Sequence, residues 1–263
     1  MEIEILLNSY GTYIYNYALK LSCHPTTAED LAQETFIKAW ENLEQLQNPD
    51  AIKSWLRKIC LNIFLMKARK ENKYTEIPYE EIDALAKEGY LLTDSSPSPE
   101  DEILVEEAIR DLQNGCFLAM ARRLTLHQRI AFSLTDMFGL PLDEVAPLIG
   151  VSTQAAKGLL YRARMNLDSF FDNHCNLIDT ANPCSCQAWI AFSKSRNNLQ
   201  KEAKEHHLVT SLDYTQSNYT FNVGVRNKIN YLYQNMPNKK PSSEWYQNVI
   251  TLTKEMYIVK NKS

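Results

Sequence analysis

Three cysteines and a histidine lie between residues 174 and 186, and no other cluster in the chain is so well suited to binding a metal ion. Cys175, Cys184 and Cys186 form the pattern C-x8-C-x-C, and Asn182-Pro183 makes a turn before the close pair. Structural zinc takes four nitrogen or sulfur ligands in a tetrahedron, and thiolate sulfur suits it. The pattern therefore predicts one structural zinc ion.

The fourth ligand of such a site is open. His174 is nearest in the sequence, but neighbouring residues rarely both reach one ion; His206 or His207 from a following helix is the alternative. Two other interpretations remain: reduced thiols without a ligand, and a metal or redox switch. We expect the other three cysteines, Cys23, Cys60 and Cys116, to be core or near-core residues.

The cluster does not predict catalysis. A zinc hydrolase needs an open coordination position and a nearby base such as a His-Glu pair on a helix, and the sequence has no such motif. We therefore expect no catalytic residue and no enzymatic activity.

Composition places the chain among ordinary globular proteins. It has 263 residues, a net charge of −4 and 44% hydrophobic residues, enough for two domains or three small ones. Acids stand near the N-terminus where a signal peptide carries basic residues, and no apolar run is long enough to span a bilayer. These features predict a cytoplasmic protein without a membrane span, in which the cysteines stay reduced or bind metal.

Charge is unevenly distributed. Residues 53–73 carry seven basic residues against one acid, whereas residues 74–105 carry nine acids against Lys87 alone. The acidic stretch contains a run of serine and proline at residues 95–99, which cannot sustain a helix and is typical of a linker. The basic stretch has the charge density expected of a phosphate-binding surface.

Two amphipathic helices precede the linker. Thr26 and Glu29 have capping-box spacing at the start of the first, whose expected buried stripe comprises Ala32, Phe36, Ala39, Trp40 and Leu43. The second should bury Ile52, Trp55, Leu56, Ile59, Ile63 and Met66 and expose its basic side. The first helix gathers acidic residues on another side, which in isolation is typical of a solvated face.

The second block, residues 125–167, has the grammar of a helix-turn-helix. Thr125 should cap a first helix, with Gln128 at the capping-box position, and FGLP at 138–141 should end it. A short helix over 142–149 and a turn at Gly150 follow, and Ser152 should cap the last helix. Few glycines and no hairpin signal predict an all-α protein.

Together the two blocks resemble bacterial RNA polymerase sigma factors of the extracytoplasmic-function (ECF) type. AEDLAQETFIKAW resembles that family's core-polymerase-binding helix, SWLRKICLN with the basic run its promoter-melting helix, and residues 125–167 its second DNA-binding domain. The implied organisation is two small helical domains, at 1–73 and 103–172, joined by the acidic linker at 74–102. A helical C-terminal extension with the cysteine cluster occupies 173–263.

The resemblance also implies site residues and partners. The core-polymerase-binding residues would be Asp30, Leu31, Gln33, Glu34, Phe36, Ile37 and Trp40. The promoter-binding residues would be Lys53, Arg57, Lys58, Asn62, Lys67, Arg69 and Lys70 in the first domain, and Ser152, Thr153, Gln154, Lys157, Tyr161, Arg162 and Arg164 in the second. Splayed bases of the minus-ten element suit a cationic surface. An anti-sigma factor is a further candidate partner, which the sequence does not identify.

The recognition helix departs from the family pattern. Ala155, Gly158 and Leu159 stand where members commonly carry threonine, serine and arginine, which implies weaker or different reading of the minus-thirty-five element. Two alternatives to a plain sigma factor are a helix-turn-helix regulator that acts without core polymerase and a metal- or redox-responsive sigma factor. In the extension we expect helices over 187–207, 221–234 and 242–259, which could form a small bundle.

Overall fold

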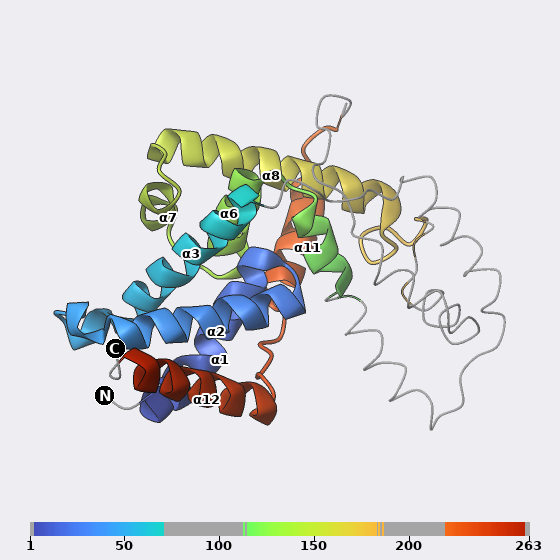
Figure 1. Cartoon of the computed structure of the whole chain (residues 1–263). Coiled ribbons are helices and arrows are strands. Elements are labelled where there is room, and N and C mark those ends of the chain that lie inside the picture. The colour runs from blue at the N-terminus through green and yellow to red at the C-terminus, as the bar shows by residue number, and fades with distance from the viewer. Residues whose placement is uncertain are drawn as a thin grey trace, which may run out of the picture. The chain divides into compact units, whose positions relative to one another are not determined.

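The computed structural model describes residues 3–70, 113, 115–182, 184, 186 and 219–260, and the regular elements in these ranges are helices (Figure 1). The fold is all-α, as the sequence predicts. The chain divides into two compact units, residues 1–72 with 237–263 and residues 73–236. The acidic linker and the helix expected over 187–207 lie outside the described residues.

The first unit is built on an antiparallel helix pair, α1 (Ile3–Ser22) and α2 (Pro25–Glu41). Cys23 adopts a left-handed φ of 56° in the tight turn between them. His24, not Thr26, is the N-cap of α2, because its side chain accepts a hydrogen bond from Thr27 N and Pro25 takes the first helical position. The expected capping box of Thr26 and Glu29 is therefore wrong.

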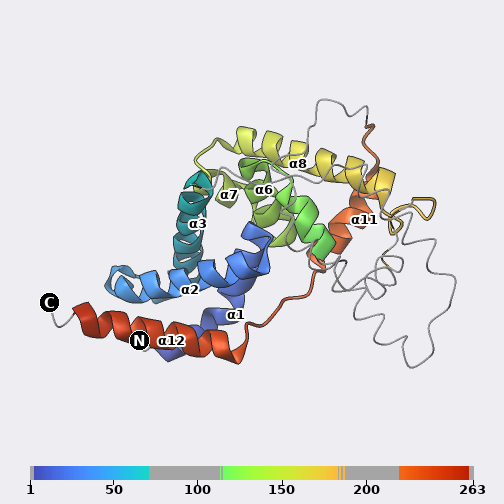
Figure 2. The ribbon, with the colours of Figure 1, turned by 45° about the vertical axis from the view of Figure 1, so that its right-hand side comes forward.

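Helices α3 (Ile52–Lys70) and α12 (Ser243–Lys260) complete this unit. Figures 1 and 2 show α3 and α12 on opposite sides of the α1–α2 pair. The predicted stripe of α3 is buried at Ile52, Leu56 and Ile63, but Met66 is 47% exposed, so its predicted burial is wrong. Cys60 and Phe64 are buried on the same helix, and Cys23 and Cys60 are core residues as predicted.

The second unit contains α6 (Leu126–Phe132), a π-helical turn over Ser133–Met137, α7 (Leu142–Leu148) and α8 (Thr153–His174). Thr125 is the N-cap of α6, but its side chain makes no capping bond, and Gln128 instead accepts a hydrogen bond from Asn166. Gly150 turns the chain between α7 and α8 with φ of 72°, and Ser152 caps α8 by accepting from Ala155 N. The helix-turn-helix is confirmed.

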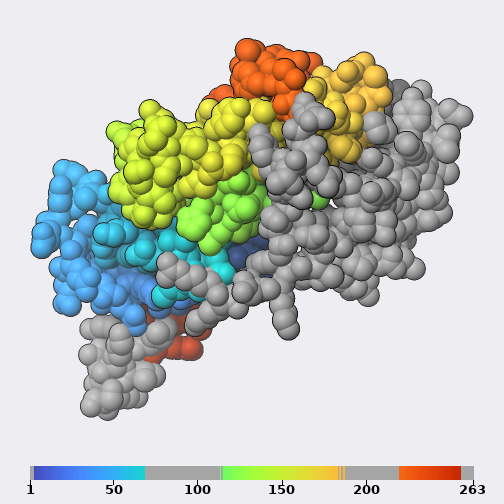
Figure 3. All heavy atoms as spheres, turned by 90° about the horizontal axis from the view of Figure 1, so that it is seen from above, coloured from blue at the N-terminus to red at the C-terminus, as the bar shows by residue number. Residues whose placement is uncertain are grey.

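The C-terminal extension is shared between the two units. Helix α11 (Val223–Gln234), capped by Asn222, packs against α8, and its orange atoms adjoin the yellow ones of α8 in Figure 3. Helix α12 packs against α1 and α2. The expectation of a bundle made by the extension helices is therefore corrected: each described amphipathic helix buries its apolar stripe on the unit it joins, α11 through Ile229 and Tyr233 and α12 through Trp245 and Val249.

Candidate nucleic-acid interface

The acidic side of α2 holds the residues expected to contact polymerase, and they differ in accessibility. Leu31 and Phe36 are fully buried between helices of the first unit, so they support the surface from beneath. Asp30 is exposed. The remaining four are partly exposed: Gln33, Glu34, Ile37 and Trp40.

Glu34 joins this side of α2 to the basic helix. Its carboxylate lies 2.9 Å from Lys67 Nζ on α3 and 3.3 Å from Lys38 Nζ one turn later in α2. Burial opposes ionisation of the carboxyl, yet the two lysines outweigh it, and the pKa of Glu34 lies below its ordinary value. A residue expected to meet polymerase and one expected to meet DNA thus form an ion pair within the domain.

The basic face of α3 presents Lys53, Lys58 and Asn62 to solvent. Arg57 is half-buried and donates a hydrogen bond of 2.8 Å to the Tyr13 hydroxyl, while Lys53 Nζ lies 5.5 Å from the centroid of the Tyr13 ring. Tyr13 of α1 therefore orients two cations of α3. The side chains of Arg69 and Lys70 lie outside the described residues.

The first turns of α8 present a second polar surface. Ser152, Thr153, Gln154, Lys157 and Arg162 are exposed, and Tyr161 is 56% exposed. Ala156 and Leu160 on the opposite side are buried against the unit. The row predicted to face outward does so. Gly158 leaves open space there, since an added Cβ would meet only Arg162 Nη1, at 3.4 Å.

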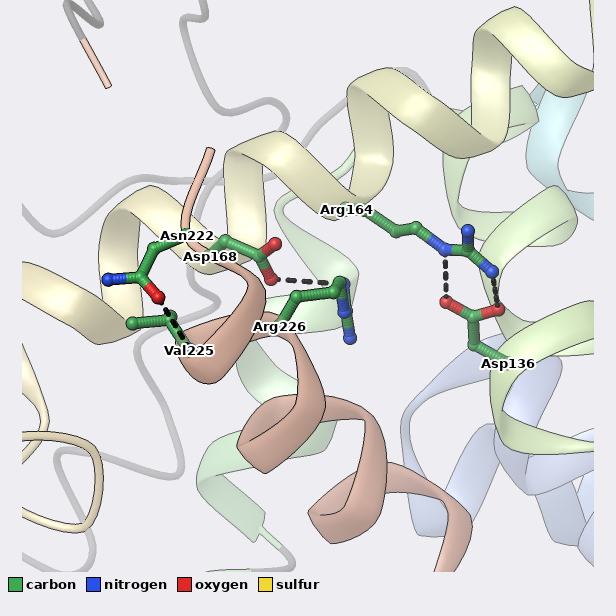
Figure 4. A network of polar contacts seen from close by, with 6 residues as sticks. All are labelled: Asp136, Arg164, Asp168, Asn222, Val225 and Arg226. Carbon is green, nitrogen blue, oxygen red and sulfur yellow. Dashed lines mark hydrogen bonds and ion pairs between the residues drawn. The ribbon is translucent and has the colours of Figure 1, made fainter. Parts of the chain in front are cut away.

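Arg164 belongs to the interior side of α8. Its Nε and Nη2 donate hydrogen bonds of 2.8 and 2.7 Å to the two carboxylate oxygens of Asp136, which is 3% exposed (Figure 4). This bidentate pair ties α8 to the π-helical turn. Arg164 is therefore engaged within the domain, whereas Arg162 faces solvent.

A second ion pair of α8 holds the extension. Arg226 Nη1 of α11 lies 2.9 Å from Asp168 Oδ1, and both side chains are almost wholly buried (Figure 4). Burial raises the pKa of the Asp168 carboxyl to about 6, against the opposing effect of Arg226. Burial likewise lowers the pKa of the Arg226 guanidinium. The sequence patterns did not single out this pair.

The cysteine loop folds back on the end of α8. Cys184 N donates to His174 O at 3.0 Å and Asn176 N donates to Cys184 O at 3.1 Å, so Cys175 and Cys184 lie side by side in an isolated β-bridge. The Asn182 amide donates to Asp172 O and Cys175 O, at 2.7 and 3.1 Å. It thereby satisfies carbonyl groups that a helix end leaves unpaired. The sequence had marked Asn182 only as a turn residue.

Cys116 is a fourth member of the cysteine cluster, although the sequence suggested a core role for it. The pKa of its thiol is raised well above the ordinary value by burial and, next, by the nearby sulfurs of Cys184, Cys175 and Cys186. Burial and the neighbouring cysteines raise the pKa of Cys186 to about 11. All four cysteines are thiols in the structure.

His174, the expected ligand beside Cys175, stacks on Phe170 with ring centroids 4.7 Å apart, and its Nδ1 lies 2.9 Å from Phe170 O. His206 and His207 lie outside the described residues. Within the described ranges, no three histidine, cysteine or carboxylate side chains stand in positions that enclose a metal ion. Within the same ranges, no helix combines the length and apolar character needed to cross a membrane.

Two family models match this chain, in the order of its two helical blocks. The model for sigma-70 region 2 matches residues 6–74, and the model for sigma-70 region 4 matches residues 114–167. The first match spans α1 to α3, and the second spans the helix-turn-helix. Residues 168–263 lie beyond both.

Curated relatives share this part of the chain at modest identity. The ECF RNA polymerase sigma factor SigE of Mycolicibacterium smegmatis is 27% identical over 64% of this chain and 61% of its own length. The RNA polymerase sigma factor YlaC of Bacillus subtilis is 27% identical, over 63% of this chain and 90% of its own length. The ECF RNA polymerase sigma factor SigM of Bacillus subtilis is 24% identical, over 67% and 99%.

Proposed function

Because this chain belongs to the ECF type of the sigma-70 family of RNA polymerase sigma factors, we propose that it binds core polymerase through α2 and promoter DNA through α3 and the start of α8. The observation that carries this assignment is the pairing of both matched domains with an outward-facing polar row on each. Such a subunit directs where transcription begins.

The polymerase contact is assigned to the accessible edge of α2. Asp30, Gln33 and Ile37 offer a carboxylate, an amide and an apolar surface on one side of the helix. Glu34 contributes to the same side while bound to Lys67. Leu31 and Phe36 act by supporting these residues from the core, since neither has exposed surface.

The DNA contact is assigned to two separate surfaces. Lys53, Lys58 and Asn62 on α3 combine phosphate neutralisation with a polar amide, which suits the unpaired minus-ten strand. Gln154 and Lys157 on α8 stand at the end of a helix-turn-helix that enters the major groove. Arg162 would hold the phosphate backbone, while Arg164 keeps its domain rigid.

The role requires no catalytic side chain in this chain, because polymerase performs the nucleotide chemistry. It also places the protein in the cytoplasm, where polymerase and DNA are found. An anti-sigma factor would act by covering one of the two polar surfaces, and the exposed side of α2 is the one we expect it to cover.

Transcription with purified core polymerase tests the proposal. The chain should stimulate initiation at its own promoters, located by footprinting the holoenzyme on genomic DNA. Asp30→Arg should weaken core binding by more than about tenfold, because a buried interfacial charge is reversed. Glu244→Arg, the matched reversal at an exposed acid of α12, should leave core affinity unchanged.

Three results would reject the assignment. The polymerase contact is wrong if Asp30→Arg binds core as tightly as the wild type does. Absence of any stimulation by a folded chain rejects the sigma activity. Tight, specific duplex binding without core, together with no stimulation, would instead establish a regulator that acts without polymerase.

A further inference from the structure

We propose that Cys116, Cys175, Cys184 and Cys186 together bind one zinc ion, which fastens the C-terminal extension to the helix-turn-helix domain. Four sulfur ligands match the closed tetrahedral site that structural zinc forms in proteins. The site is independent of polymerase and DNA binding.

The backbone already holds two of these cysteines together. Hydrogen bonds of 3.0 and 3.1 Å join Cys184 to the residues on either side of Cys175. Cys186 follows two positions later, and the Asn182 amide anchors the start of this segment to the last carbonyls of α8. Three thiols are therefore gathered at one end of α8 by contacts that do not involve sulfur.

Aromatic packing brings Cys116 to the same end of α8. The ring of its neighbour Phe117 lies 5.1 Å from that of Phe171, one turn before Cys175. Phe117 O also accepts a hydrogen bond of 2.9 Å from the Tyr233 hydroxyl of α11. These buried contacts fix the helical segment at residues 115–122, and with it Cys116, beside the loop that carries the other three thiols.

The local chemistry favours metal binding over redox switching. Burial keeps these thiols protonated at neutral pH, and buried protonated thiols react slowly with oxidants and disulfides. A zinc ion would displace those protons on binding. At Cys175, the backbone N–H groups of Leu177 and Ile178 act against burial and stabilise the thiolate form.

Binding would require the sulfurs to close around a common centre. With Zn–S bonds of about 2.3 Å, tetrahedral ligands lie about 3.8 Å apart. Each cysteine can swing its sulfur by rotation about χ1, whereas the backbone contacts above keep their places. Cys116 thus takes the fourth position, and His174 stays stacked on Phe170.

Titration of the full-length protein with Co²⁺, followed by competition with Zn²⁺, tests the site. We expect one Co²⁺ per chain, with the absorption bands of tetrahedral thiolate ligation, displaced by one Zn²⁺. Cys116→Ser and Cys186→Ser should each lower the affinity by more than about tenfold. Cys60→Ser, at a buried cysteine of the other unit, and His174→Ala should leave it unchanged.

Alkylation of the wild type provides a second reading that needs no variant to fold. Zinc should protect Cys116, Cys175, Cys184 and Cys186 from N-ethylmaleimide, as mapped by mass spectrometry of peptides, and should not alter labelling of Cys23 and Cys60. Absence of Co²⁺ and Zn²⁺ binding would overturn the proposal. Unprotected Cys116, or loss of binding in His174→Ala alone, would overturn the assigned ligand set.

Discussion

Arg226 of α11 and Asp168 of α8 form a buried ion pair, with Nη1 and Oδ1 2.9 Å apart, that joins the C-terminal extension to the helix-turn-helix domain. Within the described residues, Asp168 Oδ2 and Arg226 Nη2 have no hydrogen-bond partner. The pair is therefore costly to bury and more costly to break.

Breaking this pair should destabilise the second unit. Asp168→Asn leaves the buried guanidinium without its counter-charge, and such losses cost about 3–5 kcal/mol. The double variant Asp168→Leu, Arg226→Met should recover most of the loss, because apolar residues of similar volume often replace a buried pair without penalty. Urea unfolding monitored by circular dichroism measures both. Lys254→Ala, which removes an exposed pair with Glu4, is the control and should cost under about 1 kcal/mol.

The same carboxyl predicts a dependence of stability on pH. Burial raises the pKa of Asp168 to about 6, whereas an unfolded chain has a value near 3.9. The folded form thus binds the proton more tightly, so this group's contribution is full below pH 4 and is lost as pH rises through about 6. The melting temperature of the wild type should fall relative to that of Asp168→Asn across this window. Parallel curves for the two proteins would contradict the assignment.

Two arginines on α8 should give opposite results. Arg162 faces solvent, so Arg162→Ala should weaken promoter binding similarly for all sequences and reduce the salt dependence by about one counterion. Arg164 is held by the buried Asp136, so Arg164→Ala should lower the free energy of unfolding. Fluorescence anisotropy at several salt concentrations and urea unfolding separate the effects. Equal loss of stability in both variants would contradict the distinction.

Trp245 is expected to anchor α12 to the polymerase-binding unit. Its ring meets that of Phe36 edge-on at 6.3 Å, and its Nε1 donates to Glu29 O at 3.2 Å. Trp245→Ala should destabilise the first unit by about 3–5 kcal/mol, as is typical of large buried aromatic residues. Thermal unfolding measures the change. Leu252→Ala, at a partly exposed position of the same helix, should have a much smaller effect.

Gly11 of α1 should tolerate alanine only when Tyr246 is removed. A Cβ at Gly11 would lie 2.7 Å from Tyr246 Cε1, too close for contact. Gly11→Ala should therefore destabilise the wild type, although alanine favours helices by about 0.5–1 kcal/mol. In the Tyr246→Ala background the same change should stabilise the protein. A double-mutant cycle measures the sign reversal, and additive effects would contradict the contact.

Local signals in the sequence sufficed for the helices and the turn of the second block. Hydrophobic periodicity marked α11 and α12, Gly150 marked the turn, and Ser152 marked the start of α8. The capping positions at Thr26 and Gln128 failed because competing partners, the His24 ring and Asn166, decided which side chain bonded to what. Capping spacing alone does not include such long-range competitors.

The sequence by itself determined the all-α class, the order of the two polar surfaces and three members of the cysteine cluster, because these depend on periodicity and local spacing. Tertiary structure decided that Cys116 joins the cluster, that Arg164 binds Asp136 and that α11 and α12 pack on different units. These choices depend on contacts between residues as much as 234 positions apart, such as Thr12 and Tyr246. No local pattern records which apolar face or counter-charge a distant helix will meet.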